Sequence, residues 1–206
     1  MSDLVSQAEE TLLKSKGMAF AEIEQTVFDL LSREIDYGEV YVQSTRSESF
    51  GLEDGIVKEG AFSVDAGIGV RALAGEKTGF AYSEDIRLDG LQQAAKAARS
   101  IAKKGSSRNA PAYNATQYPA LYEGVDPISS LSDAEKVVLL RQVDSVARAQ
   151  DPRVKEVNVR ISASHESMLV MASDGTLAAD IRPLVRLDVS VIVQNGDRRE
   201  RGSAGG

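Results

Sequence analysis

The chain has 206 residues, 42% of them hydrophobic, with a net charge of −7, one histidine, and neither cysteine nor tryptophan. This composition is typical of a folded soluble chain of one or two domains, and without cysteine the chain cannot form a disulfide scaffold, a cysteine-ligated zinc module or a thiol nucleophile. We expect no nucleic-acid binding, because the densest basic run, residues 197–201, also contains acidic residues and leaves no clustered basic face.

Two helices are expected at the start of the chain. The first is short and spans about Asp3–Lys14. In the second, apolar residues follow the i, i+4, i+7, i+8 spacing of one helix face: Ile23, Val27, Leu30 and Leu31. Asp36-Tyr37-Gly38 has the composition of a helix end, so we expect it to close this second segment.

Strands are expected between Glu39 and Ser83, where apolar residues recur at every second position. The four predicted strands span about 39–47, 48–53, 56–64 and 67–82, the last with a break. Turns are expected at Glu53-Asp54-Gly55 and Ala74-Gly75-Glu76, because glycine beside acidic or small residues is typical of tight turns.

A third helix is expected from Leu88 to about Ile101, with Gly105 ending it. Residues 105–130 are rich in Ser, Asn, Pro and Tyr and are too many for a tight loop. We therefore expect a boundary between two halves of the chain in this segment.

A fourth helix and further strands are expected after this connection. Ser132 and Glu135 have the spacing of a capping box, which predicts a helix that runs to about Gln150. Apolar and polar residues then alternate again in 157–163 and in 185–193, which predicts strands.

The two halves share the same order of expected elements: a helix, strands joined by a tight hairpin, a long strand and a charged turn. Asp54-Gly55 in the first half corresponds to Asp174-Gly175 in the second. Two interpretations remain: duplicated helix-plus-sheet units at 1–105 and 130–201, or two unrelated antiparallel layers with similar turn chemistry. In both cases the expected fold is α+β, with antiparallel sheets packed with helices.

The final residues, 202–206, are Gly202-Ser203-Ala204-Gly205-Gly206. We expect them to form a Gly-rich linker to a further domain. At the other end, Met1-Ser2-Asp3-Leu4 lacks the basic and apolar regions of a signal peptide, and no run of about 18 apolar residues occurs in the chain. We therefore expect a cytoplasmic protein without a membrane segment.

Two nucleotide-binding patterns are excluded by their context. Residues 67–72 fit G-x-G-x-x-A, but they are followed by a predicted strand and turn instead of a helix, which favours a closely packed strand. Residues 75–78 resemble the end of a P-loop, but Glu76 would place a negative charge beside phosphate.

His165 is the single imidazole, and Glu166 follows it. One His–Glu pair does not supply the three ligands of a catalytic zinc, and neighbours on a strand point to opposite faces. We therefore expect no catalytic residue, metal ligand or cofactor-binding residue in this chain. His165 is expected to be hydrogen-bonded in the core or to face solvent.

Four segments carry a family resemblance: 36–41, 52–55, 67–82 and 174–186. They closely resemble the N-terminal domain of the TldD/PmbA family of bacterial zinc metalloproteases, also called the modulator of DNA gyrase family. The resemblance covers essentially the whole chain, most strongly from Asp36 onward. It favours the TldD branch over its PmbA (TldE) paralogue.

The resemblance implies a cytosolic zinc peptidase that acts as a heterodimer with a TldE/PmbA-like paralogue. The other partner considered is a second copy of the same protein. Such an enzyme degrades unfolded or short peptides and trims modified-peptide precursors inside an enclosed chamber. The family's zinc site comprises a His-Glu-x-x-x-His helix and a distant Cys in the C-terminal domain, and none of these positions exists in residues 1–206. His165-Glu166 is not that motif, because Val170 stands where the second His is required.

The implied role of this chain is therefore non-catalytic: chamber walls, peptide contacts and a dimer interface, with zinc held in the missing C-terminal domain. The alternative is a stand-alone peptide-binding or dimerisation module without protease activity.

Arg71 is the candidate residue for the substrate chamber. Gly67 and Gly69 lie on the same strand face and carry no side chains, so this face has room for a ligand beside the guanidinium. The planar fork of arginine donors suits a peptide carboxylate or carbonyl. The alternative is that Arg71 pairs with an acid such as Asp65 or Glu76 and stabilises the sheet.

Overall fold

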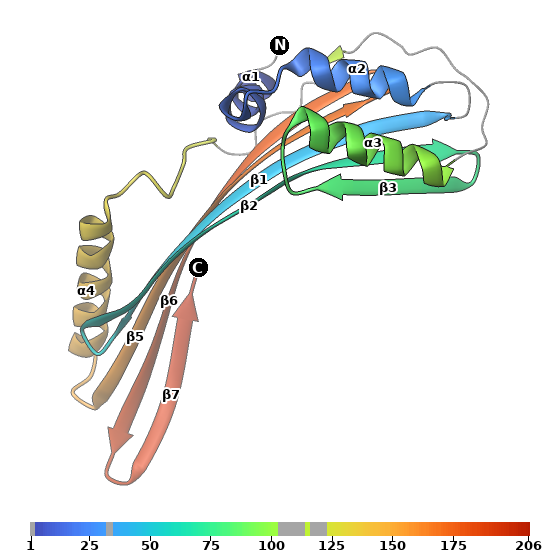
Figure 1. The fold of residues 1–206 in the computed structure, drawn as a ribbon. Coiled ribbons are helices and arrows are strands. Elements are labelled where there is room, and N and C mark those ends of the chain that lie inside the picture. Colours follow the sequence, from blue (N-terminus) through green and yellow to red (C-terminus); the bar gives the residue numbers. More distant parts are fainter. Residues whose placement is uncertain (1–2, 32–34, 103–113, 116–122) are drawn as a thin grey trace. The chain divides into compact units, whose positions relative to one another are not determined.

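The computed structural model of the chain describes all residues except 1–2, 32–34, 103–113 and 116–122. Helices and mostly antiparallel strands form an α+β fold, as predicted (Figure 1). The helices are α1 (Asp3–Ala8), α2 (Phe20–Leu30), α3 (Leu88–Ala102) and α4 (Asp133–Ala149). The strands are β1 (Tyr37–Glu53), β2 (Ile56–Ala74), β3 (Lys77–Ser83), β4 (Asn114–Ala115), β5 (Val154–Ala172), β6 (Thr176–Asn195) and β7 (Arg198–Gly205).

The strands form one seven-stranded sheet in the order β3-β2-β1-β5-β6-β4, and β7 pairs with β6 outside this path. The hairpins β2–β3 and β6–β7 are antiparallel, whereas the short β4 is parallel to β6. Within each half of the chain, consecutive long strands are therefore neighbours in the sheet.

The chain divides into two compact units, each built from three separate segments. Unit 1 comprises Met1–Thr45, Asp65–Tyr122 and Glu166–Ile181. Unit 2 comprises Arg46–Val64, Glu123–His165 and Arg182–Gly206. These units differ from the sequential halves 1–105 and 130–201, because both units take residues from β1, β2, β5 and β6.

The N-terminal helices follow the predicted pattern. The first continues beyond α1 through a π-helical turn (Glu9–Leu13) and a 3-10 turn (Lys14–Lys16). It ends at Gly17, where a φ of 73° favours glycine. In α2, the predicted apolar residues Ile23, Val27 and Leu30 are buried.

Asp36-Tyr37-Gly38 does not close α2, contrary to the prediction. α2 ends at Leu30, and Tyr37 already begins β1. The cause is a tertiary contact within unit 1: the N–H of Gly38 donates to Oγ of Ser173 at 2.9 Å, and the carbonyl of Gly38 accepts from the N–H of Ser173 at 2.8 Å. Pairing with a partner distant in sequence therefore overrides the local helix-end pattern.

Three strands, not the four predicted, occupy the region from Tyr37 to Ser83. β1 continues through residues 47–48 and β2 through 64–67, where the prediction placed breaks. Polar side chains there do not end a strand, because the backbone hydrogen bonds that define it continue. The predicted hairpins are confirmed at Asp54-Gly55, with φ angles of 49° and 78°, and at Gly75, with a φ of 58°.

α3 and α4 lie where the sequence predicted helices. α3 ends at Ala102, and the expected stop at Gly105 lies outside the described residues, as does most of 105–130. α4 begins with the predicted capping box: the N–H of Ser132 donates to the carboxylate of Glu135 at 2.8 Å, and Oγ of Ser132 accepts from the N–H of Glu135 at 3.4 Å.

Residues 202–205 belong to β7 and do not form the expected linker. β7 pairs with β6 from Asn195↔Arg198 to Asp188↔Gly205. Beyond the strand, Leu187 and Gly206 exchange two backbone hydrogen bonds, of 2.9 and 3.1 Å. Small residues therefore continue the sheet here because the neighbouring strand satisfies their backbone groups.

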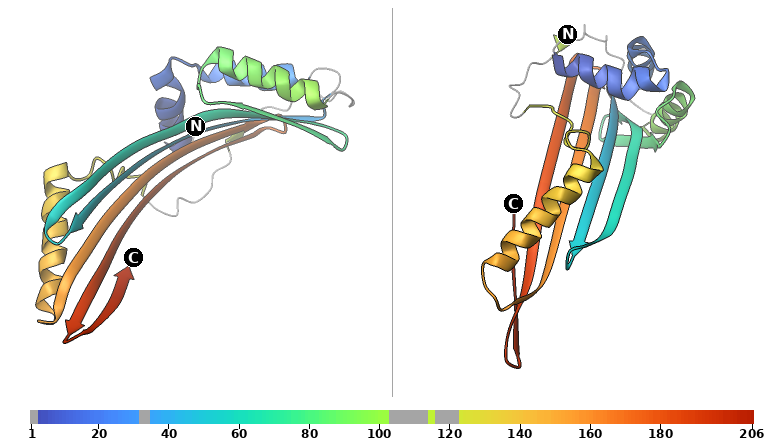
Figure 2. Two further views of the ribbon diagram at one scale, coloured as in Figure 1. Left: turned by 60° about the horizontal axis from the view of Figure 1, so that its bottom comes forward. Right: turned by 90° about the vertical axis from the view of Figure 1, so that its left-hand side faces the viewer.

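The core of unit 1 lies between one face of its strands and the helices α1, α2 and α3, which share one side of the sheet (Figure 2). The strands contribute apolar side chains at alternate positions, each at most 1% exposed: Val40, Val42, Ile68, Val70, Ala72, Leu169 and Met171. Gly79 lets α3 approach closely, because a Cβ there would overlap the carbonyl oxygen of Ala98.

Unit 2 has its own smaller core. Leu140 of α4 packs in a cluster with Leu52, Val157 and Val159 from the strands. In the described part of the chain, no helix combines the length and the apolar character needed to cross a membrane.

Candidate functional site

The side of the unit 1 sheet that faces away from α1, α2 and α3 carries polar and aromatic side chains. We call it the open face, and we define it by these residues: Tyr37, Glu39, Tyr41 and Gln43 of β1, Gly67, Gly69 and Arg71 of β2, and Phe80 and Tyr82 of β3. They alternate with the buried core positions, as residues on the second face of a strand must. The register aligns Arg71 with Phe80 and Gly69 with Tyr82.

Arg71 is anchored on the open face by Glu39. Its Nη2 donates to Oε2 of Glu39 at 2.9 Å. Its Nε lies 2.8 Å from Oε1, but the N–H is not aligned for a hydrogen bond, so this second contact is an ion pair only. The hydrogen bond that Arg71 donates to Glu39 raises the pKa of Arg71, which stays charged. Arg71 thus pairs with an acid, as the alternative interpretation expected, but this acid is Glu39 on the neighbouring strand and not Asp65 or Glu76.

Tyr37 completes this group. Its hydroxyl donates to Oε2 of Glu39 at 2.7 Å, and its ring centroid lies 5.7 Å from the guanidinium carbon of Arg71. Burial, followed by the hydrogen bond to Glu39 and the negative charge of that carboxylate, raises the pKa of Tyr37 to about 12. One carboxylate therefore orients both a cation and a phenol, while the Arg71 side chain remains 43% exposed.

The space expected beside the strand glycines is partly filled. A Cβ at Gly69 would lie 3.3 Å from the ring of Phe80, which covers this position. A cavity of about 260 Å³ remains next to it, lined by Gly67, Gly69 and neighbouring side chains, and Arg71 does not line it. The two glycines therefore line a cavity, but the cavity does not reach the guanidinium of Arg71.

His165 lies in unit 2 and is 8% exposed. Arg46 donates towards Nδ1 at 3.3 Å, which places the imidazole proton on Nε2, because a guanidinium is always a donor. Nε2 is buried and has no hydrogen-bond partner among the described residues. His165 is therefore a buried histidine, as one of the two expectations had it, but within the described residues only Nδ1 is hydrogen-bonded and Nε2 is not.

The surroundings of His165 do not fit a metal site. Arg46 also donates to Asp126 at 2.9 Å, so a fixed cation stands between the imidazole and that carboxylate. Burial alone would raise the pKa of Asp126, but hydrogen bonds from Ser129 and Ile128 and the charge of Arg46 lower it overall. In the part of the chain that the structure describes, no group of three or more His, Asp or Glu side chains could hold a metal ion.

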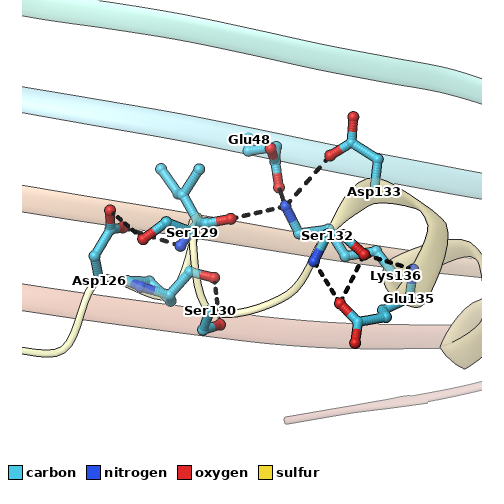
Figure 3. A network of polar contacts seen from close by, with 10 residues as sticks. Glu48, Asp126, Ser129, Ser130, Ser132, Asp133, Glu135 and Lys136 are labelled. Carbon is cyan, nitrogen blue, oxygen red and sulfur yellow. Dashed lines mark hydrogen bonds and ion pairs between the residues drawn. The ribbon is translucent and has the colours of Figure 1, made fainter.

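Unit 2 contains a second polar group around Lys136 (Figure 3). The Nζ of Lys136, a residue 5% exposed, lies 2.5 Å from Oε1 of Glu48 and donates to the carbonyl of Ile128 at 2.8 Å. It also lies 5.4 Å from the ring centroid of Phe50. These contacts connect α4 to β1 and to the segment before the helix, so we assign this buried lysine to the fold and not to a ligand site.

The sequence singled out Arg71 as a candidate but not the residues that hold it. Glu39 and Tyr37 alternate along β1, a spacing that also fits any half-exposed strand, so the pattern alone gave no sign of their role. The exposed pair Phe80 and Tyr82 shares the same spacing. Two aromatic residues on the outer face of an edge strand were a signal that could have been used.

Two family models match the chain. The PmbA/TldA metallopeptidase domain 1 matches residues 38–102, and the PmbA/TldA metallopeptidase central domain matches residues 126–206. The interval between the two matches overlaps the segment 105–130, where the sequence suggested a boundary.

Curated relatives are named as metalloproteases of the TldD type. The Metalloprotease TldD homolog of Haemophilus influenzae is 47% identical over 205 residues, which cover 98% of this chain and 42% of the relative. The Metalloprotease TldD homolog of Buchnera aphidicola subsp. Acyrthosiphon pisum is 42% identical over 198 residues, which cover 96% of this chain and 41% of the relative. The chain thus spans about two fifths of the length of these relatives.

Solved structures share the fold. A protein of Thermotoga maritima, described as a candidate modulator of a DNA gyrase, superposes with a TM-score of 0.71 at 17% identity, over 91% of this chain and 42% of that protein. TldE from Thermococcus kodakarensis gives a TM-score of 0.68 at 15% identity, over 89% of this chain and 42% of that protein. At these identities the likeness concerns the fold alone.

Proposed function

Since the chain belongs to the TldD/PmbA metallopeptidase family, we propose that it forms the non-catalytic N-terminal part of a cytoplasmic, TldD-like zinc metalloprotease that degrades or trims unfolded and small peptides. Its contribution is to supply chamber walls, contacts to the peptide and part of a dimer interface. The zinc is held by the part of the enzyme that this chain does not span, and no catalytic step is assigned to the residues described above.

The open face of unit 1 is the observation that carries this proposal. It combines the half-exposed Arg71, the Tyr37 hydroxyl, and the rings of Phe80 and Tyr82, which are 58% and 71% exposed. The opposite face of the same strands is packed with helices. Polar groups beside exposed aromatic rings suit a peptide, whose backbone needs hydrogen bonds and whose side chains need apolar contacts.

The proposed partner is a TldE/PmbA-like paralogue or a second copy of the same protein. The fold likeness to TldE supports this, because paralogous subunits of one fold can pair through equivalent surfaces. A broad peptide specificity is compatible with contacts made mainly to the peptide backbone.

Arg71→Ala in the full-length enzyme, assayed with its partner, tests the assignment of Arg71 to the chamber. Its ion pair with Glu39 is part-exposed and contributes at most about 1 kcal/mol to folding, so we expect nearly the same melting temperature. Loss of a charge-assisted hydrogen bond to the peptide should lower kcat/KM for peptide cleavage by about tenfold.

Arg99→Ala is the matched control, because Arg99 is an exposed arginine on α3, on the helix side of the sheet. It should leave cleavage unchanged. Normal peptide cleavage by the Arg71→Ala enzyme would show that Arg71 does not contact the substrate. A large drop in its melting temperature would show that Arg71 is a structural residue. Peptide binding by a full-length protein that shows no metal-dependent cleavage would favour the stand-alone binding module.

A further inference from the structure

The cavity of about 260 Å³ on the open face has a floor of bare backbone. Gly67 and Gly69 of β2 form this floor. A Cβ at Gly67 would lie 3.0 Å from the carbonyl oxygen of Ser83, and one at Gly69 would lie 3.3 Å from the ring of Phe80. Glycine at both positions lets Ser83 and the ring of Phe80 approach β2, and the cavity lies beside them.

Two aromatic rings form one wall of this cavity. Phe80 and Tyr82 lie on β3 with ring centroids 6.4 Å apart and ring planes inclined by 28°, and Tyr41 of β1 also lines the cavity. Phe80 and Tyr82 are 58% and 71% exposed. Adjacent, exposed large aromatic side chains mark interaction surfaces on soluble proteins, and the negative face of an aromatic ring attracts cations.

The charge of the cavity is negative. Asp65 and Glu84 line it, no basic residue does, and in the described part of the chain neither carboxylate has an ion-pair partner. Arg71 lies on the same strand face, but Glu39 already neutralises it. A cation that enters the cavity therefore meets two aromatic rings and two carboxylates, Asp65 and Glu84.

We propose that this cavity binds one positively charged side chain of a peptide, arginine in preference to lysine. A planar guanidinium can stack on a ring and donate in a fork to a carboxylate, whereas an ammonium is a compact, strongly hydrated charge. The volume is below the roughly 300–1,000 Å³ of sites for drug-sized ligands, which suits a single side chain. This inference rests on the proposed peptide-binding function and assigns it a substrate class.

The experiment compares two small probes that differ in charge: N-acetyl-arginine amide and its neutral isostere, N-acetyl-citrulline amide. Titration of the chain, followed by NMR of the Gly67 and Gly69 amides, should show at least about fivefold tighter binding of the arginine probe. The preference should decrease as ionic strength rises, because the carboxylates are near the surface.

Two variants test the two parts of the cavity. Asp65→Asn combined with Glu84→Gln should bring the affinities for the two probes close together, and Tyr82→Leu should weaken arginine binding. The matched controls are Glu76→Gln combined with Asp89→Asn, two exposed acids outside the cavity, and Phe62→Leu, an aromatic residue of unit 2 that is 60% exposed. The controls should bind both probes as the unchanged chain does.

Equal affinity for the two probes, or shifts that spare the Gly67 and Gly69 amides, would overturn the assignment. Retention of the preference in the Asp65→Asn, Glu84→Gln variant would do the same. The titration involves no cleavage, so its failure is distinguishable from failure of the proposed function, which the Arg71→Ala cleavage assay measures separately.

Discussion

Among single residues, Tyr37 should make the stability of the fold depend on pH. Burial and the hydrogen bond to Glu39 raise its pKa to about 12 from an ordinary value of 10.0. A raised pKa means that the folded state favours the protonated phenol, so the stability contributed by this group is complete below pH 10 and is lost as the pH rises through about 12.

Ultraviolet titration of the phenolates measures this prediction. Tyr37→Phe should remove one phenolate transition near pH 12 and should flatten the loss of stability between pH 10 and 12. The matched control is Tyr82→Phe on the same face, whose exposed ring should leave that high transition in place. A Tyr37 phenolate that forms near pH 10 in the folded chain would contradict the described contact with Glu39.

Only part of the candidate site could be predicted from the sequence. Arg71 was identified because two glycines precede it at alternate positions, and such a local pattern is visible in sequence. Its partner Glu39 is 32 residues away on another strand, and register between strands cannot be derived from alternation alone. The role of Glu39 therefore depends on the pairing of β1 with β2, which only the structure shows.

At the scale of elements, Lys136 determines how firmly α4 is held in unit 2. Its side chain is 6% exposed and that of Glu48 is 13% exposed. Lys136→Met would leave the Glu48 carboxylate partly buried without its cation, so we expect a loss of about 3 kcal/mol in the free energy of unfolding. Urea denaturation measures this loss.

Asp133→Asn is the control for that prediction, because Asp133 is 78% exposed and lies 3.7 Å from the same Nζ. It should cost less than about 0.5 kcal/mol. Addition of Glu48→Gln to Lys136→Met should recover part of the lost stability, since the unpaired charge is then removed. Equal, small losses for Lys136→Met and Asp133→Asn would show that the pair does not hold α4.

The helices were easier to predict than the ends of the strands. The α4 start was predicted because a capping box is a local signal between Ser132 and Glu135. The break placed near residues 47–48 of β1 was wrong, because the pairing of β1 with its neighbouring strands continues past the polar side chains there. Buried Lys136 was also missed, since its partner Glu48 lies 88 residues away.

At the scale of the whole molecule, neither sequential half contains a complete core. The unit 1 core includes Leu169, Met171 and Leu177, which lie beyond the domain 1 match at residues 38–102. We therefore expect residues 1–125 alone to lack a cooperative thermal transition, because the loss of three buried side chains, at about 2–5 kcal/mol each, is comparable to the whole free energy of unfolding of a typical domain. Circular dichroism of 1–125 and of the whole chain measures this.

A sharp thermal transition of residues 1–125, comparable to that of the whole chain, would contradict this expectation.

Duplication of the halves stays a prediction. Both halves have neighbouring strands in chain order, with Asp54-Gly55 and Asp174-Gly175 in corresponding hairpins. Superposition of the two helix-plus-sheet segments is the measurement that decides between a duplication and two unrelated layers.

The pairing of Gly38 with Ser173 also has a consequence for biosynthesis. These residues are 135 positions apart, and a ribosome adds about 5–20 residues per second, so β1 emerges roughly 7 to 27 s before its neighbour β5 is complete. Throughout that interval one edge of β1 lacks its native partner, and an unpaired strand edge is a template for association with other chains. The nascent protein therefore has a defined period of vulnerability, in which a chaperone that covers extended segments would be needed most.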